Sequence, residues 1–135
     1  FTLIDESYNA NPISMASAIA TLGVRGAEGR RIVGLTDMLE LGAGATAFHA
    51  GLAESLERAS IDLVFCAGPL MKSLWDALPP TRRGGYAETA DALAPLVAQA
   101  AEPGDLVMVK GSNGSKAGVV AAALRALDRA ASERG

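Results

Sequence analysis

The chain has 135 residues, half of them hydrophobic and a fifth charged, as is typical of one soluble globular domain with its own core. Its net charge of −3 argues against a surface that binds nucleic acid. Cys66 is the only cysteine, which excludes an internal disulfide and a cysteine-based metal cage. No apolar run is long enough to span a bilayer, so we expect no membrane insertion.

Apolar runs and helical patterns alternate along the whole chain. The apolar runs predict strands at residues 1–5, 31–36, 61–67 and 106–109, with a weaker strand around 86–87. Apolar residues at helical spacing follow each of them, at residues 15–22, 45–56, 71–78, 93–100 and 120–127. This alternation predicts an α/β fold with three layers, in which helices cover both faces of a mostly parallel sheet of about five or six strands.

Two of the predicted helices carry more detailed expectations. The spacing of Phe48, Leu52 and Leu56 predicts that Phe48 faces the core. Thr89 is the expected N-cap of the helix at 93–100. Pro95 lies inside that helix, which predicts a kink or a later helix start, because proline removes a backbone donor.

Polar residues crowd the point where the first strand hands over to the first helix. Asp5 ends the strand, Tyr8, Asn9 and Asn11 follow, and Pro12 suits the first turn of the helix. In an open α/β sheet this is the carboxyl edge, where ligands bind. The alternative is structural, because Asp and Asn side chains commonly bind the local backbone in turns and caps.

The other strand exits should lie along the same edge, at Asp37–Gly42, Gly68–Pro69 and Lys110–Lys116. Lys110–Lys116 is the best candidate for anion binding, since its glycines let backbone N–H groups approach a ligand ahead of a helix N-terminus. It lacks the spacing of a P-loop. The alternative is a flexible connection with solvated lysines.

Weaker candidates have structural explanations that we favour. Gly42–Ala47 formally matches a dinucleotide fingerprint, but it lies several residues beyond the predicted strand and follows acidic side chains. Asp37 and Glu40 could form an acid/base pair, although such spacing is common in loops. His49 has no second histidine to build a metal site and is expected to have a satisfied ring, and Cys66 is expected to be a core thiol.

Three segments, in order and spacing, resemble one known family. Tyr8–Pro12, Asp37–Gly42 and Gly104–Ser112 are similar to three signatures in the C-terminal domain of the MurF-type Mur ligases, the UDP-N-acetylmuramoyl-tripeptide–D-alanyl-D-alanine ligases. The resemblance covers nearly the whole chain, and the first segment is the one specific for the MurF branch.

The chain departs from this family at three positions. The family usually has an acidic residue where Ile13 stands, a glycine where Thr36 stands and an arginine where Asn113 stands. The change at Asn113 matters most, because an arginine can bind an anion through two parallel hydrogen bonds and an asparagine cannot.

The resemblance implies a function for the whole protein. These ligases activate a carboxylate with ATP as an acyl phosphate, and join D-alanyl-D-alanine to UDP-MurNAc-tripeptide during peptidoglycan synthesis in the bacterial cytoplasm. It implies that residues 1–135 are a single C-terminal domain, a fragment of a longer chain that also has N-terminal and central ATPase domains. The central domain would carry the P-loop and most of the Mg²⁺ ligands, and the C-terminal domain would close over ATP.

The resemblance also implies site residues, with no catalytic residue or metal ligand in this domain. ATP would be contacted by Asp5, Tyr8, Asn9 and Asn11. The dipeptide would be contacted by Gly68, Lys110, Gly111 and Ser112.

Two other functions remain open from the sequence. One is a different Mur-like ligase, such as a relative of folylpolyglutamate synthase, with another amino-acid substrate. The other is a stand-alone nucleotide-binding module without chemistry, which would depend on Gly42–Ala47.

Overall fold

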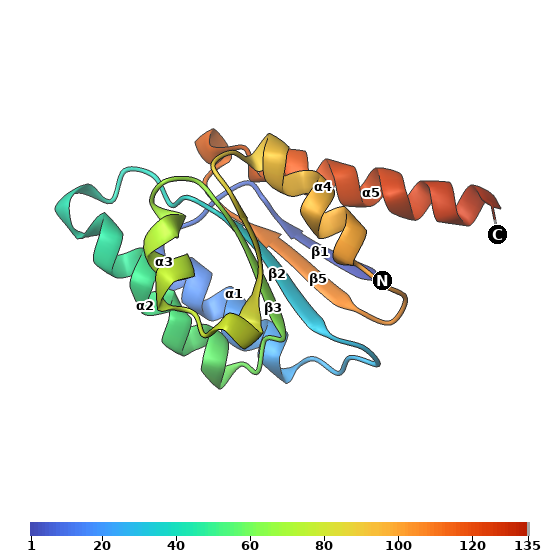
Figure 1. Cartoon of the computed structure of the whole chain (residues 1–135), viewed down its shortest axis with the longest axis horizontal. Coiled ribbons are helices and arrows are strands. Elements are labelled where there is room, and N and C mark those ends of the chain that lie inside the picture. The colour runs from blue at the N-terminus through green and yellow to red at the C-terminus, as the bar shows by residue number, and fades with distance from the viewer. Residues whose placement is uncertain (135) are drawn as a thin grey trace.

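The computed structural model describes residues 1–134, which contain one sheet of five parallel strands (Figure 1). The strands are β1 (Thr2–Glu6), β2 (Arg31–Thr36), β3 (Leu63–Ala67), β4 (Arg83–Ala87) and β5 (Leu106–Lys110). The α-helices in this range are α1 (Pro12–Val24), α2 (Ala45–Arg58), α3 (Met71–Ala77), α4 (Ala90–Ala100) and α5 (Ala117–Arg134). Short 3₁₀ turns lie at Gly42–Gly44, Pro80–Arg82 and Asn113–Ser115.

The strand order is β1-β5-β2-β3-β4, so the last strand inserts between the first two. The chain passes from β1 to β4 through α1, α2 and α3, which cover one face of the sheet, and then returns through α4 to β5. Figure 1 shows α4 and α5 on the opposite face. Reversing the direction of the crossovers moves the helices to the other face, because each crossover is right-handed. The predicted three-layer α/β fold is confirmed.

Each face of the sheet has its own hydrophobic core. Because side chains alternate along a strand, Val33 and Met108 pack against α1 and α2, whereas Ile32 and Val107 pack against α4 and α5. Both cores are built mainly from Val, Leu, Ile, Met and Ala, as expected for a chain with 4% aromatic residues. No helix in the described part of the chain is long and apolar enough to cross a membrane.

The prediction that Phe48 faces the core is wrong: Phe48 is 47% exposed. The buried face of α2 contains His49, Leu52 and Leu56 instead. His49 can be buried because its Nε2 accepts a hydrogen bond from the Met38 amide at 2.9 Å and its Nδ1 lies 2.6 Å from the Ala45 carbonyl oxygen. This arrangement requires the neutral ring with its proton on Nδ1, as assigned from the partners.

Of the two alternatives predicted from Pro95, a kink or a later helix start, the later start does not occur. Helix α4 begins at Ala90 and contains Pro95 in its second turn. The predicted N-cap is confirmed, since the Thr89 hydroxyl accepts a hydrogen bond from the Ala92 amide at 3.2 Å. The cap and the buried side chains of Leu93 and Val97 therefore maintain the helix despite the one donor that proline lacks.

A buried carboxylate joins two segments at the amino edge of the sheet. Asp105 is 2% exposed and accepts hydrogen bonds from the Arg30 amide at 2.8 Å, the Arg30 guanidinium at 2.9 Å and the Glu102 amide at 3.0 Å. Burial alone would raise the pKa of Asp105, but the hydrogen bonds from Arg30 and Glu102 outweigh it and lower that pKa. The charge of Asp105 is therefore used within the fold.

Candidate functional site at the carboxyl edge

The exits of β1, β2 and β5 meet at the carboxyl edge because β5 inserts between the other two strands. Ser112, just after β5, connects all three exits. Its hydroxyl accepts a hydrogen bond from the Leu39 amide at 2.9 Å and lies 3.5 Å from the Ala10 carbonyl oxygen, to which it donates. Its own amide donates to the Asp37 carbonyl oxygen at 3.2 Å. One serine thus joins segments that are about 70 and 100 residues away in sequence.

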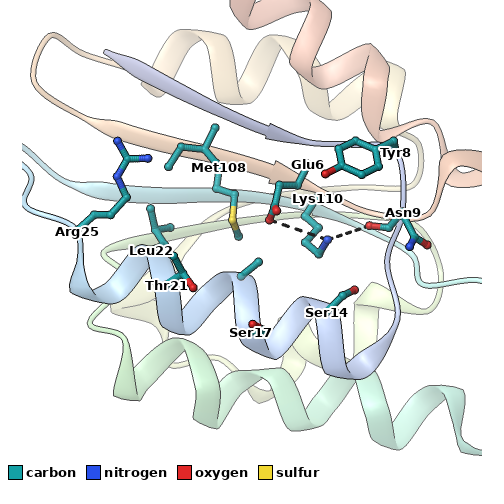
Figure 2. Close-up of a pocket in the computed structure, with 12 residues that line it drawn as sticks. Glu6, Tyr8, Asn9, Ser14, Ser17, Thr21, Leu22, Arg25, Met108 and Lys110 are labelled. Atoms are coloured by element: carbon teal, nitrogen blue, oxygen red, sulfur yellow. Dashed lines mark hydrogen bonds and ion pairs between the residues drawn. The ribbon is translucent and has the colours of Figure 1, made fainter.

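Lys110, at the end of β5, supports the turn at Tyr8 and Asn9 that follows β1. It is 4% exposed, and its Nζ donates to the Asn9 carbonyl oxygen at 2.9 Å and lies 3.9 Å from the Glu6 carboxylate. Figure 2 shows the lysine reaching between Glu6 and Asn9. The side chain of Tyr8 is left 69% exposed beside this bond, and Asn9 is exposed as well.

Two hollows adjoin the Tyr8–Asn9 turn. The rim pocket, about 280 Å³, is lined by Tyr8, Asn9, Ala10, Leu39, Glu40, Ser112, Asn113 and Gly114. The α1 groove, about 360 Å³, runs between α1 and the two strands β1 and β5 (Figure 2). Its lining combines apolar floor residues with hydroxyls and charges, from Ile4, Glu6, Tyr8, Asn9, Ser14, Ser17, Ala18, Thr21, Leu22, Arg25, Met108 and Lys110.

A third hollow, of about 260 Å³, lies further along the edge toward α4. Gly68, Thr89 and Lys116 are among its lining residues. Gly68 is therefore separated from the rim pocket, although both hollows share Leu39 and Gly114.

Asn11 has a local structural role. Its Oδ1 accepts a hydrogen bond from the Ser14 amide at 2.9 Å, and the Ser14 hydroxyl accepts one from the Asn11 amide at 3.1 Å. This reciprocal capping box begins α1, with Pro12 in the first turn as expected. The contact between Asn11 and a nucleotide stays a prediction.

Asp5 lies on the other face of the sheet from Lys110. One carboxylate oxygen accepts a hydrogen bond from the Ser7 amide at 2.9 Å, and the other forms an ion pair with Arg125 of α5. Burial alone would raise the pKa of Asp5, but the hydrogen bonds from Ser7 and Arg125 outweigh it and hold that pKa below its usual value. Asp5 is thus charged and oriented, and it does not line either hollow beside Tyr8.

Two glycines are required by close approaches at this edge. A Cβ at Gly111 would lie 1.7 Å from the hydroxyl oxygen of Thr36. A Cβ at Gly68 would lie 2.4 Å from the Asp37 carboxylate, and the φ of Gly68 is +110°, which side chains rarely adopt. Glycine is therefore the residue that fits each position, whatever the ligand.

The structure gives Asp37 a structural role in place of the possible acid/base pair. Asp37 is 5% exposed, and its oxygens accept hydrogen bonds from the amides of Met71 at 2.8 Å and Leu70 at 3.2 Å. It thus caps the start of α3. Glu40 is exposed, with a φ of 64°.

The remaining candidates are also structural. Gly42 lies six residues beyond the end of β2, so the Gly42–Ala47 segment does not have the geometry of a dinucleotide fingerprint. Cys66 is buried, and burial together with the nearby Asp37 raises its pKa to about 12, which makes it an inert thiol. Among the side chains of residues 1–130, no group of three or more acidic, histidine or cysteine side chains could hold a metal ion.

Sequence reasoning missed three features of this edge: the bridging role of Ser112, the Asp5–Arg125 pair, and the α1 groove. Local pattern carries no signal for the first two, whose partners are about 100 residues apart. The groove had a weak signal, the hydroxyls of Ser14, Ser17 and Thr21 at helical spacing on one side of α1.

Comparison with protein families places the chain. The model of the Mur ligase, glutamate ligase domain, matches residues 1–113. The chain belongs to this family. Among curated proteins, it is 33% identical over 119 residues to the UDP-N-acetylmuramoyl-tripeptide–D-alanyl-D-alanine ligase of Bacillus subtilis (strain 168), covering 85% of this chain and 26% of that ligase. It is 31% identical to the ligase of the same name from Mycobacterium bovis, covering 98% of this chain and 30% of that ligase. The chain therefore spans less than a third of the length of these relatives.

Solved structures have the same fold. The MurF ligase from Thermotoga maritima in complex with ADP superposes with a TM-score of 0.76 at 23% identity, covering 94% of this chain and 29% of that one. A MurF structure from Acinetobacter baumannii also gives 0.76, at 24% identity, covering 90% and 27%. The resemblance to the MurF-type C-terminal domain, drawn from the three sequence segments, is confirmed.

Proposed function

We propose that this chain is the C-terminal domain of a longer ATP-dependent ligase that adds D-alanyl-D-alanine to UDP-MurNAc-tripeptide in peptidoglycan synthesis. The family match and the names of the relatives support this proposal. The bacterial cytoplasm, where such nucleotide-linked precursors would be used, is the proposed location.

The observation that carries the proposal is the rim pocket. Ser112 and Lys110 bind backbone groups of the adjoining loops, and leave the side chains of Tyr8, Asn9 and Asn113 exposed around the hollow. A rigid rim of exposed polar groups at the carboxyl edge suits a domain that closes over polar ligands held by the rest of a larger enzyme.

The reaction joins an amine to a carboxylate that ATP has activated as an acyl phosphate. We propose that this domain contributes positioning and the exclusion of water, which protects a reactive acyl phosphate from hydrolysis. Asp5, Tyr8, Asn9 and Asn11 would lie on the ATP side. Gly68, Gly111 and Ser112, three of the four residues that the resemblance assigns to the dipeptide, would lie on the dipeptide side.

Mg²⁺ belongs to the same proposal as a cofactor held mainly by a central domain. Since the described residues offer no group of acidic, histidine or cysteine side chains for a metal, we assign no step through Mg²⁺ to this chain. When bound with ATP, the ion would supply charge neutralisation at the phosphates. The N-terminal and central domains of the same protein are the proposed partners.

The test is a ligation assay on the full-length protein with ATP, UDP-MurNAc-tripeptide and a panel of amines. We expect product formation and phosphate release with D-alanyl-D-alanine, and none from residues 1–135 alone. Ligation by the isolated domain would contradict the domain assignment. A preference for glutamate over D-alanyl-D-alanine would instead support a ligase of the folylpolyglutamate synthase type.

A further inference from the structure

Lys110 is the most deeply buried lysine of the three in the chain, and its charged end faces the α1 groove. Its neighbours on β5 explain this direction. Val107 and Val109 pack under α4 and α5, so the alternation of side chains turns Met108 and Lys110 toward α1. The ammonium therefore does not line the rim pocket, although Ser112, two residues later, does.

The contacts of Lys110 are with backbone and with one carboxylate. Its Nζ lies 2.9 Å from the Asn9 carbonyl oxygen and 3.9 Å from the Glu6 Oε2. A hydrogen bond from an ammonium is stronger than one between neutral groups, and burial strengthens it further. The Glu6 carboxylate, itself 31% exposed, offsets the charge of the buried lysine.

The second support of this turn comes from the same strand exit. Ser112 donates to the carbonyl oxygen of Ala10, the residue that follows Asn9. Two consecutive carbonyl groups are thus held by side chains of the β5 exit, while the side chains of Tyr8 and Asn9 remain exposed. The turn is anchored by its backbone and presents its side chains.

We propose that Lys110 is a positioning residue that acts through the Tyr8–Asn9 turn, and not a direct contact of the dipeptide. This inference rests on the proposed function, in which Tyr8 and Asn9 lie on the ATP side. Removing the ammonium would release the Asn9 carbonyl and let the turn move. The loss would therefore appear in the affinity for ATP, with the dipeptide and the chemical step little affected.

The first experiment measures the steady-state kinetics of Lys110→Met in the full-length enzyme. Methionine approximates the length of the lysine stem and removes the donor. We expect the KM for ATP to rise roughly tenfold, the factor typical for the loss of one charge-assisted hydrogen bond, with the KM for dipeptide and kcat within about twofold. Lys72→Met is the matched control, because Lys72 lies on the surface of α3, where it pairs with Asp76, and should leave all three parameters unchanged.

Two outcomes would overturn the inference. A rise in the KM for dipeptide with an unchanged KM for ATP would mean direct contact with the dipeptide. A fall in kcat with both KM values unchanged would mean a role in the chemical step. Absence of ligation by the unsubstituted enzyme would instead count against the proposed function.

Amide hydrogen exchange of the full-length protein tests the positioning role without relying on activity. Lys110→Met should speed exchange in the segment from Ser7 to Asn11, and Lys72→Met should not. If Lys110→Met is poorly folded, Glu6→Gln provides the second variant: it keeps the bond to Asn9 and should leave exchange in this segment within about twofold. Unchanged exchange in a folded Lys110→Met protein would contradict the anchoring of the turn by Lys110. Exchange in Glu6→Gln that rises as much as is expected for Lys110→Met would also contradict it, because Glu6→Gln keeps the bond between Lys110 and Asn9.

Discussion

Polar residues at the amino edge and at the carboxyl edge of the sheet have different roles. At the amino edge, the carboxylate of Asp105 is almost completely buried and accepts hydrogen bonds from Arg30 and from the Glu102 amide. At the carboxyl edge, Lys110 and Ser112 also bind backbone groups, but the loops that they hold leave polar side chains exposed. The comparison teaches that Asp105 at the amino edge stabilises the fold, whereas Lys110 and Ser112 at the carboxyl edge hold loops whose other polar side chains are exposed to solvent.

The cause of this difference is topological. The connection after β1 leads to α1 on one face and the connection after the adjacent β5 leads to α5 on the other, and the rim pocket lies among the exits of these strands. At the amino edge, the segments before β2 and β5 run side by side, and the Gly29 amide donates to the Gly104 carbonyl oxygen at 2.9 Å. These two segments are thereby joined through their backbones.

The largest expected effect is on stability at the amino edge. Asp105→Ala should lower the free energy of unfolding by about 3 kcal/mol, because it leaves the Arg30 and Glu102 donors without their acceptor. Urea denaturation measures this loss. Asp76→Ala is the control, since Asp76 forms an exposed pair on α3 and should change stability by less than about 0.5 kcal/mol. Equal losses in the two variants would remove the distinction between the edges.

At the carboxyl edge, a substitution of Gly111 should also lower stability. Gly111→Ala should lower the free energy of unfolding by about 2 kcal/mol, because the new Cβ overlaps the Thr36 hydroxyl. Combining it with Thr36→Ala should recover part of that loss in a double-mutant cycle. Gly51→Ala, where the added Cβ meets nothing within 4 Å beyond the nearby backbone of its own helix, should be neutral or stabilising. A lack of coupling between positions 36 and 111 would argue against this close approach.

The next largest expected effect is on the pH dependence of stability, to which Asp105 at the amino edge should contribute. The lowered pKa of Asp105 means that its stabilising contribution is present above the unfolded pKa, near 3.9, and is lost as the pH falls through the lower folded pKa. The unsubstituted chain should therefore lose stability below about pH 4. Asp105→Asn should be less stable at pH 6 and show a smaller further loss between pH 5 and pH 2, as measured by urea denaturation at each pH. A parallel loss in both proteins would assign the acid sensitivity to other carboxylates, such as Asp5.

The smallest expected effect on stability is at Asp5. Its pair with Arg125 is partly exposed, so Asp5→Ala should change the free energy of unfolding by less than about 1 kcal/mol. In the full-length enzyme, the same substitution should raise the KM for ATP at least as much as the KM for dipeptide. An unchanged KM for ATP would contradict the proposed place of Asp5 on the ATP side, while Arg125→Ala tests whether the ion pair is needed to orient the carboxylate.

Most of the fold was predictable because its signals are local. Continuous apolar runs marked the buried parallel strands, and helical spacing with caps such as Thr89 and Asn11 marked the helices. The fourth strand was expected to be weak and is a five-residue edge strand. Phe48 was predicted incorrectly because hydrophobic spacing ignores a histidine that can be buried once both ring nitrogens have partners.

The sequence by itself determined the α/β class, the polar strand exits and the family, because periodicity, turn chemistry and motif order are properties of neighbouring residues. Only the tertiary structure decided that β5 lies between β1 and β2, that Lys110 faces α1, and that Ser112 reaches Ala10. These contacts join residues about 100 positions apart. They depend on the order in which the strands pair and on the face of the sheet where each side chain is buried. The free energy of the whole core sets both.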